Sequence, residues 1–412
     1  AIYFINPYTT EQQGKAPKIV LEGGQKFPLY NQGDDEQAFL KELKDYSDYV
    51  KANPDTAVDI FEYNSPRILF TGRASDANQV YNVEKVNVVE STLAWSKVVD
   101  DMLKFAGLEE NSKDPKHDST GIRTTVRVMQ PFGGAYAAGD HVGIQYHVAD
   151  DFLRTDKHSM DGIRWGTVHE LGHQLDIIPR TWGEVTNNMW SNEEYIKAGI
   201  RDNVNYNSIY DRVSSDVDTN YKYEDFDLSA RLGMFWQLRL AKADYWQSLE
   251  RMYRERKPKA ETYQQKCDLF AEYSSELLGA NLTEYITRYG MTLSDECKAK
   301  LNKYPKLDKK IWYLNSDAMN YKGKGFTEDV KVEVNSKLDK SAKTNTLNLN
   351  IDKDNSGDLL GYEVSKDGKV LGFTKSNTFV VKNVDVNENA KYDVNEVYGN
   401  IKENSTSGIF GT

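Results

Sequence analysis

The chain has 412 residues, which is enough for two or three domains with a substantial core. Its 52 basic and 63 acidic residues give a formal net charge of −11. No stripe of basic residues occurs, which argues against nucleic acid or an anionic membrane surface as a partner. No apolar run approaches the length of a membrane span, so membrane insertion is not expected. The start at Ala1 carries no charged-then-apolar signal segment and is interpreted as that of a fragment or a processed form.

Short apolar runs separated by Gly and Pro predict β-structure at the beginning of the chain. We expect residues 1–75 to form a β-rich subdomain, or else the first wall of a catalytic domain that covers residues 76–321. A helix is predicted at 36–52, where apolar residues recur at helical spacing, and a second helix at 78–107.

A glycine-rich turn, GGAYAAG, lies between two strands that are predicted at 124–130 and 141–148. Gly133 and Gly134 lack side chains, so they would allow the close approach of a substrate backbone or of a bulky group attached to it. A plain hairpin turn is the alternative interpretation of the same residues.

The sequence HELGH contains His169 and His173 four positions apart, with Glu170 directly after the first of them. On an α-helix these positions lie on one face, so both imidazoles can reach a single ion. Two neutral imidazoles, a carboxylate and a water make a catalytic tetrahedral site, so Zn2+ is the expected ion. Glu170 would then face the open position as a general base. The helix should also bury an apolar face, formed by Val168, Leu171, Leu175 and Ile178.

The third protein ligand decides the class of zinc site. The last histidine of the extended pattern HExxHxxGxxH is excluded, because Pro179 stands in its place. Two carboxylates follow at suitable distances, Glu184 after ten intervening residues and Glu193 after nineteen. Glu184 is preferred, because Pro179 and Gly183 break the helix and would turn the chain back towards the metal.

Side chains around the third ligand are candidates for supporting or substrate-binding roles. Asn187 and Asn188 would lie one turn beyond Glu184 and could hydrogen-bond the ligands. Substrate contacts are expected from three residues in this stretch, namely Trp182, Arg180 and Asn188. Because no histidine follows the HELGH sequence, the oxyanion would be stabilised by another side chain, with Tyr206 and Tyr210 as candidates.

The second half of the chain changes from helical to β-like patterns. Residues 227–312 predict a series of helices, so strands come first and helices afterwards, which is typical of an α+β fold. Cys267 and Cys297 fall in these helices; two buried thiols are favoured, and a disulfide between aligned neighbouring helices is the alternative. From 322 to 412 the composition changes and apolar residues alternate with polar ones. This pattern predicts a C-terminal β-sandwich of fibronectin type III character that contributes no catalytic residue.

Residues 352–363, DKDNSGDLLGYE, fit the spacing of an EF-hand calcium loop, with Glu363 at the twelfth position. An EF-hand needs flanking helices, whereas strand patterns flank this loop on both sides. Glu363 belongs to one of these strand patterns, which would aim its carboxylate away from the loop. A polar turn between strands is therefore favoured over a Ca2+ site.

HELGH, a short spacer that ends in Trp182, and then GEVTNN resemble the enhancin and mucin-targeting gluzincin metallopeptidases. The likeness continues in PFGGAYAAGDHVGI (131–144), LGMFWQLRLAKADYWQSLERMYRE (232–255) and FAEYSSELLGANLTEYITRYGM (270–291). One departure is KADYW (242–246), where the resemblance predicts a Gly before the Asp. The resemblance implies a zinc endopeptidase, secreted or at the cell surface, that cuts next to a Ser or Thr bearing an O-linked sugar.

The leading hypothesis is therefore a monomeric zinc endopeptidase that acts on mucin-like O-glycosylated proteins. A zinc endopeptidase without a glycan requirement is the first alternative. A glycan-binding adhesin with a degenerate zinc site is the second, and the intact set His169, Glu170, His173 and Glu184 argues against it.

Overall fold

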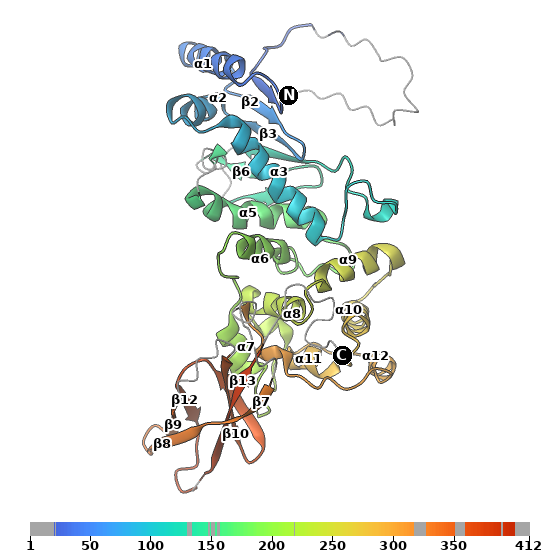
Figure 1. Ribbon diagram of the computed structural model, residues 1–412, viewed down its shortest axis with the longest axis vertical. Helices are drawn as coiled ribbons and strands as arrows, with labels where there is room; N and C mark the ends of the chain where they lie inside the picture. The colour runs from blue at the N-terminus through green and yellow to red at the C-terminus, as the bar shows by residue number, and fades with distance from the viewer. Residues whose placement is uncertain are drawn as a thin grey trace.

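The computed structural model describes residues 20, 22–129, 134–146, 149, 153–154, 157–217, 219–316, 327–350, 359–388 and 390–399. The molecule is elongated (Figure 1), with a sheet and its helices at one end, further helices in the middle and the C-terminal strands at the other end. This order of β-structure followed by helices agrees with the predicted α+β fold.

A six-stranded sheet with the strand order β1-β2-β3-β4-β6-β5 forms the N-terminal end. Its strands are β1 (Leu29–Asn31), β2 (Phe61–Asn64), β3 (Ile68–Gly72), β4 (Thr124–Met129), β5 (Tyr136–Ala137) and β6 (Val142–Gln145). β3 pairs in parallel with β4, so the sheet includes strands from both sides of the boundary predicted at residue 75. This continuity favours the interpretation of the opening residues as the first wall of the catalytic domain. β5 pairs antiparallel with β6 and closes the sheet on one side.

Three helices accompany the first strands, namely α1 (Glu36–Ala52), α2 (Ala74–Asn78) and α3 (Val88–Phe105). α1 has the bounds that the sequence predicts, and the Asp35 side chain caps it by accepting hydrogen bonds from two backbone N–H groups of the first turn. The single helix predicted at 78–107 is instead interrupted. A short π-helical turn follows α2, and α3 begins anew after its cap residue Asn87.

Helix α5 (Lys157–Leu175) carries the HELGH sequence, and α6 (Asn188–Lys197) packs against it. Val168 and Leu171 are buried, and Leu175 is partly buried against the same core. Ile178, in contrast, is 86% exposed, so the prediction that it belongs to the buried face is wrong. The reason is that α5 ends at Leu175, and Ile178 already lies in the following loop.

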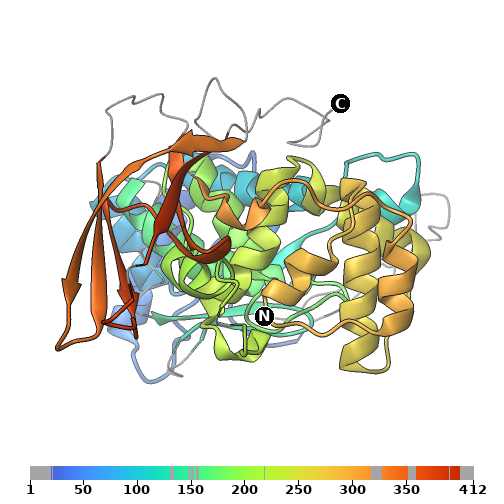
Figure 2. The same ribbon diagram turned by 90° about the horizontal axis from the view of Figure 1, so that it is seen from below.

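The middle of the molecule is helical. Its helices are α7 (Tyr206–Arg212), α8 (Leu228–Ala241), α9 (Tyr245–Arg256), α10 (Tyr263–Leu278), α11 (Thr283–Arg288) and α12 (Asp295–Leu301). Seen from below (Figure 2), helices α9 to α12 lie on the opposite side of the molecule from the C-terminal strands. One apolar core joins these helices to α5, α6 and the N-terminal sheet. Cys267 and Cys297 are buried free thiols in this core, as predicted.

Two sheets form the C-terminal module, with the strand orders β11-β10-β13-β7 and β12-β9-β8. Their strands are β7 (Thr327–Lys331), β8 (Glu333–Asp339), β9 (Thr344–Asn350), β10 (Leu359–Lys366), β11 (Lys369–Thr374), β12 (Thr378–Lys382) and β13 (Tyr392–Tyr398). Leu347 and Leu349 of one sheet share a small core with Tyr362, Val364 and Val394 of the other. The β-structure is as predicted, and its fibronectin type III character stays a prediction.

The C-terminal module also packs directly on the helices. The ring of Phe373 in β11 stacks on Tyr313 with 4.2 Å between ring centroids and contacts Tyr210 at 4.7 Å. Buried Glu363 in β10 accepts a hydrogen bond from Lys310 Nζ at 2.6 Å. Glu363 is thus directed to the helices from within a strand, while the earlier positions of the calcium-loop pattern, 352–358, lie outside the described residues.

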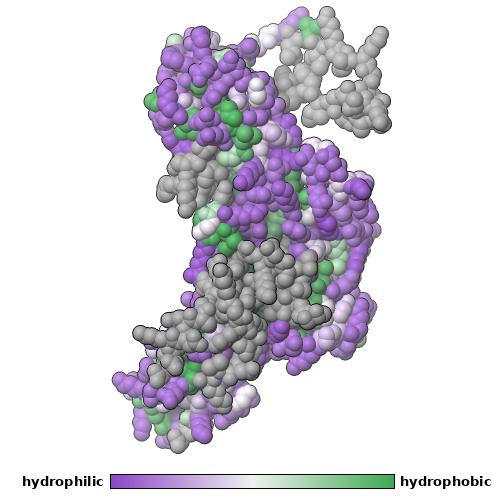
Figure 3. All heavy atoms as spheres, in the orientation of Figure 1, coloured by the Kyte–Doolittle hydropathy of each residue, from purple (hydrophilic) through white to green (hydrophobic). Residues whose placement is uncertain are grey.

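The surface fits the acidic composition. The face drawn in Figure 3 is mostly hydrophilic, with small and scattered apolar patches among the coloured residues. In the described parts of the chain, no helix combines the length and the apolar character needed to cross a membrane.

Candidate metal centre

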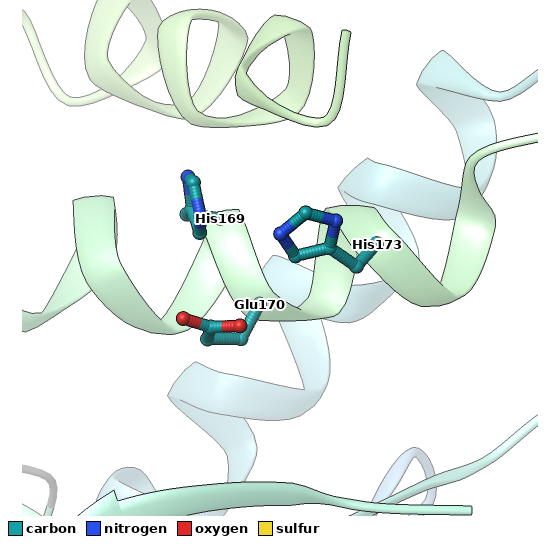
Figure 4. Close-up of side chains that lie close together, drawn as sticks. All are labelled: His169, Glu170 and His173. Atoms are coloured by element: carbon teal, nitrogen blue, oxygen red, sulfur yellow. The ribbon is translucent and has the colours of Figure 1, made fainter. Parts of the chain in front are cut away.

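Three side chains of α5 form the centre of the site. The rings of His169 and His173 lie 4.9 Å apart between centroids and are nearly perpendicular, at 89°. Each of the two histidines and Glu170 offers a ligand atom within 4.8 Å of the others. Figure 4 shows the two imidazoles projecting from the helix one turn apart, with the Glu170 carboxylate beside them.

The loop between α5 and α6, residues 176–187 and here called the ligand loop, brings a second carboxylate to the histidines. Glu184 Oε2 lies 3.0 Å from His169 Nε2, and Glu184 Oε1 lies 3.4 Å from His173 Nε2. The backbone of Glu184 has φ of +59°, in the left-handed region that non-glycine residues rarely adopt. Glu193 lies on α6 instead, where its carboxylate pairs with Arg239 Nε at 3.2 Å. The structure thus brings Glu184, and not Glu193, to the histidines.

These distances suit a tetrahedral metal ion. Two ligand atoms that are each about 2.0–2.2 Å from one tetrahedral zinc ion lie roughly 3.3 Å apart. The Glu184 oxygens lie 3.0 and 3.4 Å from the two Nε2 atoms. A carboxylate oxygen and an imidazole lone pair also repel each other at this distance unless a proton or a metal cation lies between them. The donor set therefore fits a divalent metal, with Glu184 placed better than Glu170 to share it.

Asn188 holds the first histidine in the form that can bind a metal. His169 Nδ1 lies 2.7 Å from Asn188 Oδ1, and because that oxygen is an acceptor, Nδ1 carries the proton and Nε2 is left free. Asn188 Nδ2 donates to the Glu184 carbonyl at 2.9 Å. Asn187 Nδ2 donates to the carbonyl of His169 at 3.2 Å. Asn188 is therefore occupied behind the ligands, which leaves it unsuited to the predicted substrate contact.

Gly172 explains how the ligand loop comes so close to α5. A Cβ atom at this position would lie 2.4 Å from the backbone oxygen of Asn187, well inside contact distance. The backbone of the loop thus packs on the bare backbone of the helix, one residue before His173. No residue type other than glycine would permit this contact at position 172.

We expect Gly172→Ala to push the ligand loop away from the histidines. Overpacking of this kind costs about 1–3 kcal/mol, and here it should also weaken metal binding. Thermal unfolding with and without added zinc measures both effects. Gly166→Ala is the matched control on the same helix, because a Cβ there meets nothing within 4 Å. Equal zinc binding by the two variants would contradict the expectation.

Glu170 differs from Glu184 in its surroundings. It is only 9% exposed, whereas the Glu184 side chain is 57% exposed. Burial raises the pKa of Glu170, while the neighbouring histidines oppose that rise. The backbone N–H of Ala137 in the end strand β5 also opposes the rise, to a smaller extent. Ala137 was not among the residues predicted from the sequence, where its only signal is its place in the glycine-rich turn.

The predicted substrate contacts of Trp182 and Arg180 are wrong, because both side chains face the core. Trp182 is 6% exposed, and its ring packs against Phe235 and Phe270 at 5.2 and 5.4 Å between centroids. Arg180 is fully buried between Asp176 and Glu250. Their closeness to Glu184 in sequence does not place them in the site.

The tyrosine candidates for the oxyanion also lie elsewhere. The hydroxyl of Tyr210 donates to the carbonyl of Tyr313 at 3.1 Å, beneath the C-terminal module. Tyr206 is buried beside it, with its hydroxyl 3.2 Å from Asp202. The role predicted for Tyr206 and Tyr210 is therefore wrong. Gly134 lies in open space with φ of +130°, while Gly133 is outside the described residues.

Known proteins share both the sequence pattern and the fold. A family model described as Peptidase M60, enhancin and enhancin-like, matches residues 23–290. The chain belongs to this family. Its membership confirms the resemblance seen in the sequence and makes this enhancin-like protein a metallopeptidase. Among the curated proteins, no significant match is found.

Several solved structures are similar to this M60 peptidase, and the next two come from Clostridium perfringens. A structure with the CBM32-1, CBM32-2 and M60 catalytic domains of ZmpB is 32% identical, with a TM-score of 0.81 over 93% of this chain and 40% of that chain. The M60 catalytic domain of ZmpC, in complex with the sialyl T antigen, is 29% identical, with a TM-score of 0.78 over 91% of this chain and 74% of that chain. A metallopeptidase in complex with the Tn antigen is 17% identical and shares the fold, with a TM-score of 0.61 over 90% of this chain and 75% of that chain.

Proposed function

We propose that this M60 peptidase is a secreted or cell-surface zinc endopeptidase that cuts O-glycosylated, mucin-like proteins next to a glycosylated Ser or Thr. The observation that carries the peptidase chemistry is the placement of the Glu184 carboxylate across both histidine Nε2 atoms, with Glu170 beside them. This arrangement provides three metal ligands and a separate base.

In this proposal, His169, His173 and Glu184 hold the zinc ion. The ion would polarise the scissile carbonyl and lower the pKa of the attacking water. Glu170 takes the proton from that water and passes it to the leaving amine. Its burial suits this task, because a carboxylate with a raised pKa is a stronger base than an exposed one. The neighbouring histidines and the N–H of Ala137 oppose the rise in the pKa of this carboxylate.

The end strand β5 offers an edge for the substrate backbone. Ala138 N–H bonds inwards to the His141 carbonyl at 2.8 Å, whereas Ala137 N–H is directed to Glu170. Gln174 of α5 donates to the Ala138 carbonyl at 3.2 Å and so ties the strand to the metal helix. An extended peptide added to this edge would pass next to Glu170. Because Gly134, two residues before β5, faces open space, a sugar on the peptide would find room there.

The relatives support a glycan as part of the substrate. The catalytic domain of ZmpC is in complex with the sialyl T antigen, and it covers most of this chain at 29% identity. Because Trp182 is buried, this chain would have to recognise the sugar through residues nearer to β5.

The test is the cleavage of one peptide with and without a single O-linked N-acetylgalactosamine on a Thr. We expect kcat/KM for the glycopeptide to be higher by about a hundredfold or more, because a site built to hydrogen-bond the sugar leaves polar groups unpaired without it. Equal cleavage of both peptides would establish a zinc peptidase without a glycan requirement. Binding of the glycopeptide without cleavage by the zinc-loaded protein would favour an adhesin.

A further inference from the structure

Arg180 of the ligand loop is a fully buried charge. Its Nη2 lies 2.6 Å from Asp176 Oδ1 at the end of α5 and 2.6 Å from Glu250 Oε1 on α9. Its guanidinium carbon lies 4.3 Å from the centroid of the Trp246 ring, also on α9. Neither Arg180 nor Glu250 is accessible to solvent. Arg180 thus links the ligand loop to the helical middle of the molecule.

The carboxylate of Asp176 that contacts Arg180 also accepts a hydrogen bond across the ligand loop. Its Oδ2 accepts a hydrogen bond from Thr186 Oγ1 at 2.7 Å. Thr186 Oγ1 in turn accepts the backbone N–H of Trp182 at 2.9 Å. Glu184 lies between Trp182 and Thr186 in the chain, so these bonds fix both sides of the residue that faces the histidines. Arg180 thus contacts, through Asp176, the hydrogen bonds that flank Glu184.

Stability alone is a poor reason for such an arrangement. Buried ion pairs lose so much hydration that apolar side chains of similar volume are often as stabilising or better. Burial raises the pKa of Glu250 and thus opposes its charge, while the guanidinium groups of Arg180 and Arg254 favour the charge. Opposite charges held 2.6 Å apart in the core instead fix a position, because moving them apart would leave each charge buried and unpaired. The position fixed here is that of the ligand loop.

We propose that Glu250 and Arg180 are positioning residues, through which helix α9 fixes the third ligand Glu184 relative to the two histidines. The proposal rests on the proposed function, because it assumes that Glu184 binds the metal. It assigns the helical middle a direct part in building the metal centre.

The test is Glu250→Gln, which keeps the shape of the side chain and leaves Arg180 paired with Asp176. Residues that orient metal ligands typically change affinity by about 10- to 100-fold, so zinc binding should weaken by about tenfold or more. Zinc affinity is measured by competition with a chromophoric chelator. The visible absorption of the cobalt-substituted protein reports on the coordination of the ion and should change as well.

Glu193→Gln is the matched control, since it breaks a comparable Glu–Arg pair, with Arg239, that does not contact the ligand loop. A folded Glu250→Gln protein with the zinc affinity and cobalt spectrum of the wild type would overturn the proposal. If Glu250→Gln does not fold, Arg180→Lys replaces it, because lysine keeps the charge but lacks the planar guanidinium whose Nη2 contacts both carboxylates and which lies over the Trp246 ring. Wild-type zinc binding by the folded Arg180→Lys protein would then overturn it.

An error in the metal ligands and an error in the positioning role would give different zinc-binding results. If the wild-type protein binds no zinc, or if Glu184→Gln binds it as well as the wild type, the proposed metal centre is wrong. If Glu184→Gln loses zinc while Glu250→Gln and Arg180→Lys both keep it, only the positioning role is wrong.

Discussion

Glu170→Gln is expected to lower kcat by about a thousandfold or more while the protein keeps its zinc. Proton transfer by a positioned base contributes about 10²- to 10⁴-fold to the rate, and the remaining activity would come from the polarised water alone. Glutamine has the shape of glutamate without its basicity. Glu184, in contrast, places its two oxygens 3.0 and 3.4 Å from the histidine Nε2 atoms, as expected of a ligand. Metal analysis together with steady-state cleavage of a glycopeptide measures the two effects separately.

Two results would count against this role of Glu170. Loss of zinc from a folded Glu170→Gln protein would make Glu170 a ligand and not the base. Activity near that of the wild type would show that another group accepts the proton. Asp176→Asn would be a poor control, because Asp176 supports the ligand loop. Glu193→Gln is better, since Glu193 is also a largely buried carboxylate, on α6, and pairs with Arg239 and not with the histidines.

Glu184→Gln is expected to lower zinc affinity by at least about a hundredfold. Substitution of a residue that only orients a ligand lowers metal affinity by up to about a hundredfold, and here the ligand itself loses its charge. Activity should fall in proportion to bound metal. The zinc content of the dialysed protein and chelator competition give the affinity directly. The corresponding change at Glu193, the other carboxylate of suitable spacing, should leave zinc in place. If Glu193→Gln lost zinc while Glu184→Gln kept it, Glu193 and not Glu184 would be the third ligand.

The parts of the site that are local in sequence were predictable. An i, i+4 spacing on a helix brings His169 and His173 together whatever the rest of the chain does. Breaks at Pro179 and Gly183 correctly indicated a loop that returns to the helix, and Glu184 is where that loop meets the histidines. The bounds of α1 were also predictable, because the cap residue and the apolar spacing agree.

The direction of side chains within that loop was not predictable. Trp182 and Arg180 are close to Glu184 in sequence, yet their side chains are taken up by α8, α9 and α10, which lie far along the chain. The position of Tyr206 and Tyr210 after the third ligand suggested the oxyanion role, whereas in α7 Tyr210 contacts Tyr313 and the C-terminal strands and Tyr206 contacts Asp202. In each case a tertiary contact decides which way the side chain points, and a single sequence contains no record of it.

The packing of Phe373 against Tyr313 and Tyr210 affects the order in which the protein can fold during synthesis. Tyr210 leaves the ribosome long before Phe373 does, and contacts between residues so distant in sequence form late, because a long stretch of chain must be closed first. Until β11 has been made, the aromatic surface around Tyr210 and Tyr313 has no cover. The nascent peptidase therefore passes through a stage with an exposed aromatic face, which is the kind of surface that chaperones bind. Completion of the last strands ends that stage.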